Sequence, residues 1–438
     1  MTDLDARGAA PSRSGPAPAP PAPGTDAVPG PPRILLAVTD PFCAVFFRGQ
    51  LAALAAAGAE VTLVTSPGER ARAIAAEEGA RYCPVPMVRE MAPLADLRAL
   101  LTLVRLLRRL RPDVVCAGTP KAALLVLAAA AAVRVPDRLF VLHGLRSTTL
   151  SGLKRAVVRA AERTSARLAT DVLCVSSSLR DEAAAEGLVQ ADRARVVGSG
   201  SCNGVDLERF RTGPLQVAAA RRFRRGLGCG PEETLIGFVG RLTKEKGLLE
   251  LAEAWQLVRD GRTRLVLIGP DESGPDCEPA LRLLRRDPRV RFTGAIDDMP
   301  AAFAAMDLLV LPTWREGFGN VLIEAAAMSR PVIASRVTGC VDAVADGVTG
   351  TLVPPRDAVA LADAIQEYLD RPDVRTAHGT AGRRRVEVLF DSRRVWQEHL
   401  ELYDALLRRR GRPALLPSDD RSLPRPAPRR PVRPPVTA

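Results

Sequence analysis

The chain has 438 residues, of which 47% are apolar and 26% charged, and this length predicts two or three domains with ample cores. Its net charge of +12 is uneven: residues 1–32 carry −1 and the segment from Arg408 to the end carries +7, which leaves +6 for residues 33–407. That balance is ordinary for a body of this size, so we expect no nucleic-acid partner. The eight cysteines are scattered, with no close pair and no nearby histidine, which supports neither a disulfide framework nor a metal site.

Both ends of the chain are rich in proline. Residues 1–32 contain nine of the 37 prolines, and residues 411–438 contain eight. Such segments lack the apolar surface that offsets the entropy of ordering, so we expect a disordered Pro/Ala-rich tail and a disordered Arg/Pro-rich tail. Prolines also stand where a signal peptide would have its apolar stretch, which favours a cytoplasmic protein over an exported one.

Between the tails, short apolar runs alternate with helical patterns. In residues 33–205 the expected strands are 33–40, 60–66, 113–118, 137–144 and 171–177, and the expected helices are 50–57, 70–78, 94–111, 121–133 and 153–169. The longest uncharged apolar run, Ala122–Val133, has 12 residues, whereas a membrane-spanning helix needs about 20. Continuous apolar strands between helices predict a parallel sheet that is covered on both faces.

The same rhythm restarts after residues 206–231, a polar and basic segment that we interpret as a linker. In residues 232–391 the expected strands are 234–240, 263–269, 290–294, 307–312, 331–335 and 350–354, and the expected helices are 247–260, 278–286, 299–305 and 320–328. The pattern predicts an α/β protein with two doubly wound, Rossmann-like domains that face a cleft at the carboxyl ends of their strands. A last helix, 392–410, is expected to cross back to the first domain.

Two cations follow the first strand of the second domain. That strand ends at Gly240, and a loop with Arg241 and Lys246 leads into a helix that opens at Gly247. Cations beside a helix N-terminus suit a diphosphate, because arginine can bind bidentately and lysine acts as a point charge. A solvated basic loop is the alternative interpretation.

Two glutamates flank a glycine-containing turn in residues 312–335. Glu316 lies in the loop after a strand, and Glu324 lies in the first turns of the next helix. Gly317 and Gly319 would let a ligand approach the backbone N–H groups at the helix start. Carboxylates accept hydrogen bonds from sugar and ribose hydroxyls, so together with the two cations this segment predicts a nucleotide-sugar site. Alone, it could equally be a helix start with an ordinary capping carboxylate.

Three strings in the second domain, GRLTKEKG, EGFGNVLIEAAAMSRPVIAS and VADGVTGTLVPPRD, closely resemble glycosyltransferase family 4. The resemblance covers residues 33–410, about 86% of the chain. It implies the GT-B architecture and a retaining enzyme that needs no metal for catalysis. It also implies that the first domain binds the acceptor and that the second binds the nucleotide-sugar donor.

The resemblance assigns roles to single positions. It implies that Arg241 and Lys246 hold the nucleotide diphosphate, that Glu316 contacts the transferred sugar, and that Glu324 binds the ribose hydroxyls. The other implied donor-binding positions lie near the diphosphate, the sugar and the base: Gly240, Gly294, Ile296, Gly317, Phe318, Gly319 and Asn320.

In the first domain, His143 follows a strand end in the string FVLHGLRS, where it would face the cleft. A lone histidine there is as often structural, but the other two, His378 and His399, fall in late helical segments. The resemblance implies that His143 contacts the donor sugar. Family members often carry a Gly-Gly pair after the first strand, whereas this chain has only Gly49 in that region, so no phosphate role is assigned to the first loop.

The strings FFRGQL, TPKAALL, HGLRSTTLSGLKR and GSGSCNGVD are similar to a subset of the family that acts on polyprenyl-diphosphate-linked sugars in capsule or exopolysaccharide assembly. This similarity makes Thr119, Lys121 and Arg146 candidates for binding the acceptor, with ordinary surface positions as the alternative. The basic helices 94–111 and 153–169 could rest on an anionic lipid surface, or could be half-buried helices with solvated faces.

Two further sequence patterns resemble functional motifs but are expected to have structural roles. Ser176 lacks the neighbouring glycines of a nucleophile elbow and is expected to be a helix N-cap. Gly198 and Gly200 follow an apolar run, but Gly204 comes one residue too late for a dinucleotide-binding loop, so no NAD site is expected.

The sequence thus predicts a glycosyltransferase, either a hexosyltransferase or an N-acetylhexosaminyltransferase, without a cofactor. Its expected partners are a nucleotide-sugar donor and a lipid-linked or small-molecule acceptor, with peripheral contact to an anionic membrane at its cytoplasmic face. A nucleotide-sugar 2-epimerase and a non-catalytic binding protein are the alternatives. The combination of Arg241, Lys246, Glu316 and Glu324 argues against the non-catalytic one.

Overall fold

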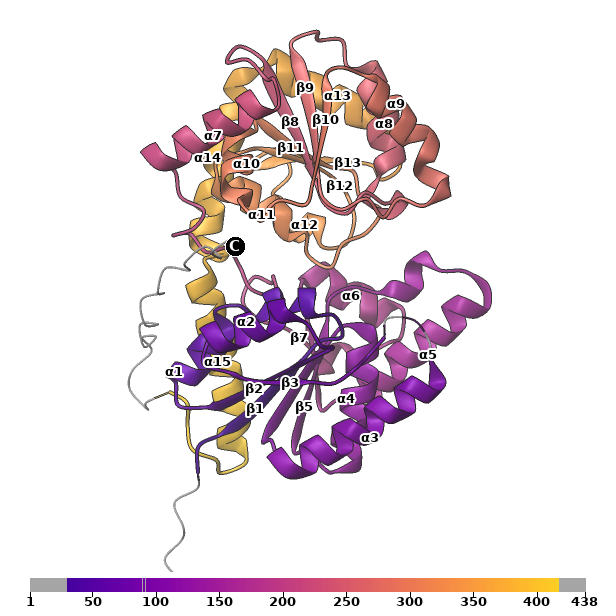
Figure 1. Cartoon of the computed structure of the whole chain (residues 1–438), viewed down its shortest axis with the longest axis vertical. Helices are drawn as coiled ribbons and strands as arrows, with labels where there is room; N and C mark the ends of the chain where they lie inside the picture. The colour runs from indigo at the N-terminus through magenta and orange to yellow at the C-terminus, as the bar shows by residue number, and fades with distance from the viewer. Residues whose placement is uncertain (1–29, 89, 91, 417–438) are drawn as a thin grey trace, which may run out of the picture. The chain divides into compact units, whose positions relative to one another are not determined.

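Two parallel sheets with helices on both faces organise the computed structural model, which describes residues 30–416 apart from residues 89 and 91 (Figure 1). Both sheets belong to one compact unit of the chain. This arrangement confirms the predicted α/β class with two doubly wound halves. Most of the two expected disordered tails, residues 1–29 and 417–438, lies outside the described residues.

The first sheet has seven parallel strands in the order β3-β2-β1-β4-β5-β6-β7. The strands are β1 (Arg33–Ala37), β2 (Glu60–Thr65), β3 (Arg81–Pro84), β4 (Val114–Gly118), β5 (Asp137–Leu142), β6 (Asp171–Cys174) and β7 (Ala194–Val196). The helices are η1 (Pro41–Phe47), α1 (Gln50–Ala56), α2 (Glu69–Glu77), α3 (Pro93–Leu110), α4 (Pro120–Ala132), η2 (Arg146–Thr149), α5 (Gly152–Leu168), α6 (Ser177–Ala185) and η3 (Ala191–Arg193). Ser176 caps α6 by accepting a hydrogen bond from the Leu179 amide, as predicted.

The second sheet has six parallel strands in the order β10-β9-β8-β11-β12-β13. The strands are β8 (Thr234–Val239), β9 (Thr263–Ile268), β10 (Val290–Gly294), β11 (Leu308–Leu311), β12 (Val332–Ser335) and β13 (Gly350–Val353). The helices are η4 (Lys244–Lys246), α8 (Leu248–Leu257), η5 (Pro275–Cys277), α9 (Glu278–Arg286), α10 (Met299–Ala305), α11 (Asn320–Ala327), α12 (Cys340–Ala343), α13 (Ala358–Asp370) and α14 (Pro372–Leu389). No helix in the described part of the chain is both long and apolar enough to cross a bilayer.

The prediction that residues 206–231 form a linker is wrong, because this segment contains helix α7 (Pro214–Gly226). This helix packs against α10, and Ala220 is buried in the contact. Arg224 bonds to the carboxylate of Asp307 at 2.9 Å and to the carbonyl of Ala305 at 2.8 Å. The arginines that made the segment look like a solvated linker are therefore partly structural.

Helix α15 (Ser392–Arg409) packs against the first sheet through Trp396, Leu400 and Tyr403, which are buried beside β1 and β4. Every second residue of β1 faces this side, whereas the intervening residues face α3 and α4, as alternation in a strand requires.

The expectation that disorder begins at residue 411 is wrong for residues 411–416, which the structure places against the first sheet. Arg412 forms an ion pair with Asp113 at 2.8 Å, and the amide of Leu415 donates to Asp404 at 2.7 Å. Arg408 and Arg410 also have acidic partners, so part of the positive charge counted with the tail is neutralised on the folded body.

Candidate active site

The loop after β8 and the loop after β11 lie together at the carboxyl ends of neighbouring strands, and they carry two ion pairs. Lys246 Nζ pairs with Glu316 Oε1, and both side chains are largely buried. One residue earlier in each loop, Glu245 pairs with Arg315 at 3.0 Å. Thus the structure brings together two of the predicted catalytic residues, 70 positions apart in the sequence.

Backbone contacts hold these two loops in register. The carbonyl of Glu245 accepts hydrogen bonds from the Trp314 amide at 2.8 Å and from the Thr313 hydroxyl at 3.1 Å. Because Glu245 and Lys246 are adjacent, these bonds also fix where the Lys246 side chain begins.

Arg241, the other predicted cation, lies apart from this pair. Its guanidinium bonds to Glu272 at 2.8 Å, and both side chains are about two-fifths exposed. Gly240 precedes it at the end of β8 with a φ of 155°. In this structure Arg241 is therefore a solvent-facing cation at the rim of the loop.

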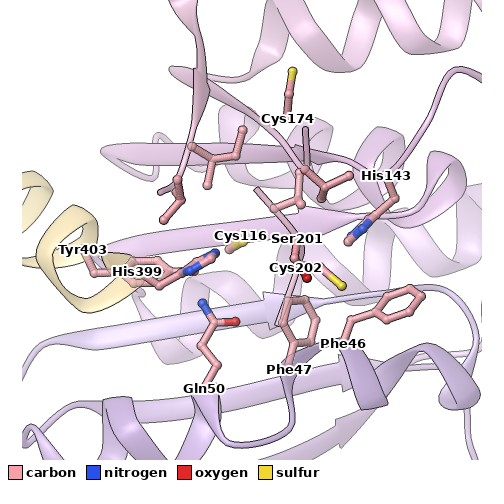
Figure 2. A pocket seen from close by; sticks show the side chains of 14 residues that line it. Phe46, Phe47, Gln50, Cys116, His143, Cys174, Ser201, Cys202, His399 and Tyr403 are labelled. Carbon is pink, nitrogen blue, oxygen red and sulfur yellow. The ribbon is translucent and has the colours of Figure 1, made fainter. Parts of the chain in front are cut away.

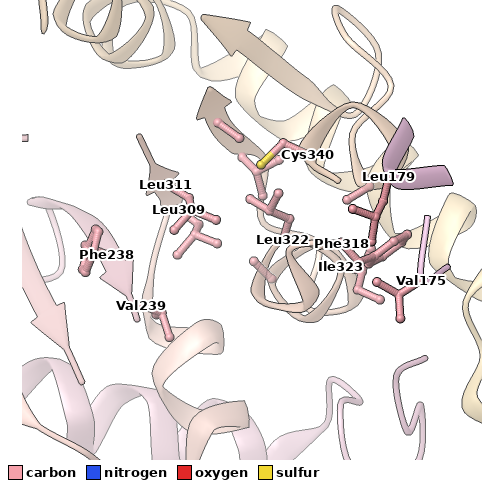
Figure 3. Packing of buried hydrophobic residues seen from close by; sticks show 14 of the residues in the cluster. Val175, Leu179, Phe238, Val239, Leu309, Leu311, Phe318, Leu322, Ile323 and Cys340 are labelled. Atoms are coloured by element: carbon pink, nitrogen blue, oxygen red, sulfur yellow. The ribbon is translucent and has the colours of Figure 1, made fainter. Parts of the chain in front are cut away.

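Helix α11 begins at Asn320, directly after Gly319, whose φ of 78° lies in the left-handed region. The Asn320 side chain accepts a hydrogen bond from Ser201 Oγ at 3.0 Å and donates to Cys202 Sγ at 3.2 Å. Phe318 is 3% exposed and belongs to a buried cluster with Val175 (Figure 3). The side chain of Phe318 is therefore not available to a ligand, and the expected role of its backbone stays a prediction.

Gly317 meets the first half of the molecule. A Cβ at this position would lie 2.1 Å from the carbonyl oxygen of His143, and Ser176 Oγ donates to the Gly317 carbonyl at 2.7 Å. The loop that carries Glu316 is thus in contact with loops that follow β5 and β6.

His143 lies at the end of β5 among the side chains shown in Figure 2, with its ring centroid 5.0 Å from that of Phe46. Its Nε2 atom is buried and has no hydrogen-bond partner among the described residues. Burial lowers the pKa of His143 to about 4, so the ring is neutral at physiological pH. The neutral ring can therefore donate a hydrogen bond to a ligand or accept one from it, but it carries no charge.

Glu324 is partly buried and lines a cavity of about 250 Å³ with Arg209 and Asn320. Burial raises the pKa of Glu324 to about 7, and the nearby Arg209 opposes this shift. Arg209 also donates to the carbonyl of Asp297 at 3.1 Å. It thereby connects the Glu324 cavity to the loop of Gly294 and Ile296, the positions predicted to lie beside the base.

A second cavity, of about 170 Å³, is lined by two of the three predicted acceptor residues, Thr119 and Arg146, together with His143. Lys121 does not line it. Its ammonium group bonds to Asp96 at 2.7 Å and to the carbonyl of Glu90. The structure thus engages Lys121 in an intramolecular pair instead of presenting it at this cavity.

Two family descriptions match the chain: "Glycosyl transferase 4-like domain" over residues 43–200 and "Glycosyl transferases group 1" over residues 233–371. Together with the two-sheet fold, they define the class: the chain belongs to the glycosyltransferases of the GT-B fold and is an enzyme. A capsular polysaccharide biosynthesis glycosyltransferase, CapM from Staphylococcus aureus, is 32% identical over 364 residues, which are 82% of this chain and 94% of that protein.

Solved structures share the fold. Sucrose-phosphate synthase from Thermosynechococcus elongatus has a TM-score of 0.72 at 23% identity, over 86% of this chain and 100% of that chain. HepE from Anabaena in complex with UDP and glucose has a TM-score of 0.71 at 20% identity, over 85% and 99% of the two chains.

Sequence reasoning missed Arg209 and Arg315, which line the two cavities. Arg315 stands directly before Glu316, but an arginine in a loop is usually solvated, and nothing in its spacing distinguishes it. Arg209 lies in the loop before α7, and only the folded chain brings it to Glu324.

The turn after Lys246 should be sensitive to substitution. Gly247 has a φ of 77°, and an added Cβ would lie 1.9 Å from the carbonyl oxygen of Pro312. We expect Gly247→Ala to lower the free energy of unfolding by about 3 kcal/mol or more, because left-handed strain and a backbone clash add. Gly228→Ala is the matched control: Gly228 has a φ of 69° with open space around it, so about 1 kcal/mol is expected. Equal shifts in urea denaturation would contradict the close approach of the two loops.

Proposed function

We propose that this enzyme is a retaining glycosyltransferase that moves a sugar from a nucleotide-sugar donor to a lipid-linked saccharide in capsule, exopolysaccharide or cell-envelope glycan assembly. The observation that carries the proposal is the buried pair of Lys246 and Glu316 next to the start of α11. A cation and a carboxylate beside a helix start that has no side-chain cap suit a sugar diphosphate, because the cation can face the phosphates and the carboxylate can face the sugar hydroxyls. CapM, the capsule glycosyltransferase, supports the choice of product class.

In this proposal, the second half of the chain binds the donor. Negative charge builds on the diphosphate as the glycosidic bond breaks, and Lys246 stabilises it where it develops, assisted by Arg241 once a ligand draws it from Glu272. Glu316 contacts the transferred sugar, and Glu324 binds the ribose. No metal or other cofactor takes part.

Retention of the anomeric configuration is what the family resemblance implies, and it could arise by a covalent intermediate or by same-face substitution. A covalent intermediate needs an enzyme nucleophile, and the described residues of the proposed acceptor cavity offer one carboxylate. Its carboxylate, Glu162, is 3% exposed and accepts hydrogen bonds from the amides of Arg146 and Ser147 and from the Ser147 hydroxyl. A carboxylate held in this way is poorly placed to attack a sugar. We therefore favour same-face substitution through an oxocarbenium-like state over a covalent intermediate.

The lipid-linked acceptor is supported by the outer surface of the first half. Leu94, Leu97 and Leu101 lie at helical spacing on α3 and are 46–75% exposed, and Leu153 at the start of α5 is 81% exposed. Arginines accompany these leucines on α3. Apolar side chains beside basic ones are typical of helices that rest in an anionic lipid interface, which would place the enzyme at the cytoplasmic membrane face.

The test is a panel of nucleotide sugars incubated with purified enzyme and a membrane extract, with product mass as the readout. The proposal expects a glycosylated product in the lipid fraction. Product formed only on water-soluble acceptors would favour the soluble-acceptor alternative, and an epimerised donor formed without any acceptor would favour the 2-epimerase.

Nucleotide binding should depend on pH through Glu324. Because the pKa of Glu324 is raised to about 7, increasing the pH through neutrality ionises the carboxylate and strengthens its hydrogen bonds to ribose hydroxyls. We expect nucleotide affinity, measured by calorimetry, to rise several-fold between about pH 6 and pH 8, and Glu324→Gln to show a flatter profile. The phosphate groups of the nucleotide also change protonation over this pH range. Their effect on the affinity is the same for the wild type and for Glu324→Gln, so it cancels when the two pH profiles are compared. Identical profiles would remove Glu324 from the nucleotide site.

A further inference from the structure

The cavity of about 170 Å³ on the first half of the molecule is lined by a residue of the second half. Arg315 belongs to the loop between β11 and α11, yet it lines this cavity together with Thr119, His143 and Arg146. Its Nη1 atom donates to the carbonyl of Leu145 at 3.5 Å, which places the guanidinium at the loop after β5. One cavity is therefore assembled by loops from both sheets.

The charges around this cavity favour an anion. In the described part of the chain, the Arg146 guanidinium has no acidic partner, and the Nε atom of Arg315 is buried without a hydrogen-bond acceptor. The acid that lines the cavity, Glu162, is occupied by the amides of residues 146 and 147 and by a hydroxyl. His143 is neutral, so the Arg146 guanidinium and the Nε atom of Arg315 are the cationic groups left for an anion.

Arg315 has one acidic neighbour, Glu245, which it contacts through Nη2 at 3.0 Å. This contact uses one edge of the guanidinium and leaves Nε, with no partner of its own, for an incoming ligand. An arginine Nε–H can donate a charge-assisted hydrogen bond to a phosphate oxygen, while the contacts of the two Nη atoms with Leu145 and Glu245 hold the guanidinium in place.

We infer that this cavity binds the phosphate or diphosphate group of the acceptor, and that Arg315 is an acceptor-binding residue contributed by the donor-binding half. The inference rests on the proposed function. Arg315 directly precedes Glu316, so a phosphate held by Arg315 and Arg146 lies beside the residue proposed to contact the transferred sugar. The acceptor would then be positioned by both halves of the enzyme at once.

The test uses geranylgeranyl diphosphate in detergent micelles as the probe, with geranylgeraniol, which lacks the diphosphate, as the comparison ligand. We expect Arg315→Ala to weaken binding of the diphosphate probe about tenfold or more, Arg315→Lys to weaken it less, and neither to change binding of the alcohol. Arg286→Ala is the matched control, because Arg286 is an exposed arginine of the same half on α9, away from the cavity, and its probe affinity should equal that of the wild type.

Two results would overturn the inference. One is wild-type affinity of Arg315→Ala for the diphosphate probe. The other is loss of probe binding in Arg241→Ala but not in Arg315→Ala, which would place the probe at the donor site. A titration with UDP, GDP and ADP separates this inference from the proposed function, because Arg315→Ala should keep nucleotide affinity within about twofold. Failure of the proposed function would appear in the nucleotide titration and in donor turnover, whereas failure of this inference appears with the prenyl probe alone.

Discussion

Replacing Lys246 by alanine is expected to lower turnover by about 100-fold or more. The substitution removes the cation proposed to stabilise the departing diphosphate, and losing one preorganised charge-stabilising donor costs this much in other enzymes. It also leaves Glu316 without its ion-pair partner. The measurement is the rate of sugar release from the nucleotide sugar at saturating donor, with the membrane extract as acceptor.

Lys244→Ala is the matched control for this prediction. Lys244 lies two residues earlier in the same loop, is 43% exposed and pairs with the exposed Asp276. We expect its turnover to stay within a few-fold of the wild type. If Lys246→Ala retained the rate of Lys244→Ala, the assignment of Lys246 to the leaving group would be wrong.

Replacing Glu316 by glutamine is expected to lower turnover by a similar factor while changing the dissociation constant of the free nucleotide by less than about fivefold. The change keeps the shape of the side chain but removes the charge that pairs with Lys246 and that would face the transferred sugar. A residue that acts on the sugar in the transition state should affect kcat more than nucleotide binding.

Glu253→Gln, on the exposed side of α8, removes one carboxylate charge from the same half and should leave turnover unchanged. Circular dichroism would verify that both variants keep the fold. If weaker nucleotide binding explained the whole loss of rate in Glu316→Gln, Glu316 would contact the nucleotide and not the transferred sugar.

Much of the fold could be predicted because the central strands are continuous apolar runs, which have few alternatives to a buried parallel sheet. The two edge strands of the first sheet were not predicted. β3 and β7 have three or four residues, are only partly buried, and contain polar residues such as Arg81 and Arg195. Helix α7 was missed because its arginines resemble those of a solvated segment, although Arg224 is bonded to Asp307.

The sequence identified residues of the candidate site, but it could not predict the contacts between them. The loop motifs identified Lys246 and Glu316 separately, whereas their pairing depends on β8 and β11 being neighbours in the sheet. The sequence predicts that Lys121, at the start of α4, can bind a ligand. In the structure its ammonium group forms an ion pair with Asp96, 25 residues earlier on α3. Nothing in the sequence around Arg315 predicts a binding role, because the residues that line the cavity with it follow strands of the other sheet.

The Lys246 and Glu316 pair is proposed to support transfer of a sugar from a nucleotide donor with retention of configuration. The most direct test is proton NMR of the product made by the purified enzyme, comparing the anomeric configuration of the new glycosidic bond with that of the donor. We expect the same configuration in product and donor, and little product from Lys246→Ala. An inverted configuration, or a free epimer in place of a transferred sugar, would contradict it.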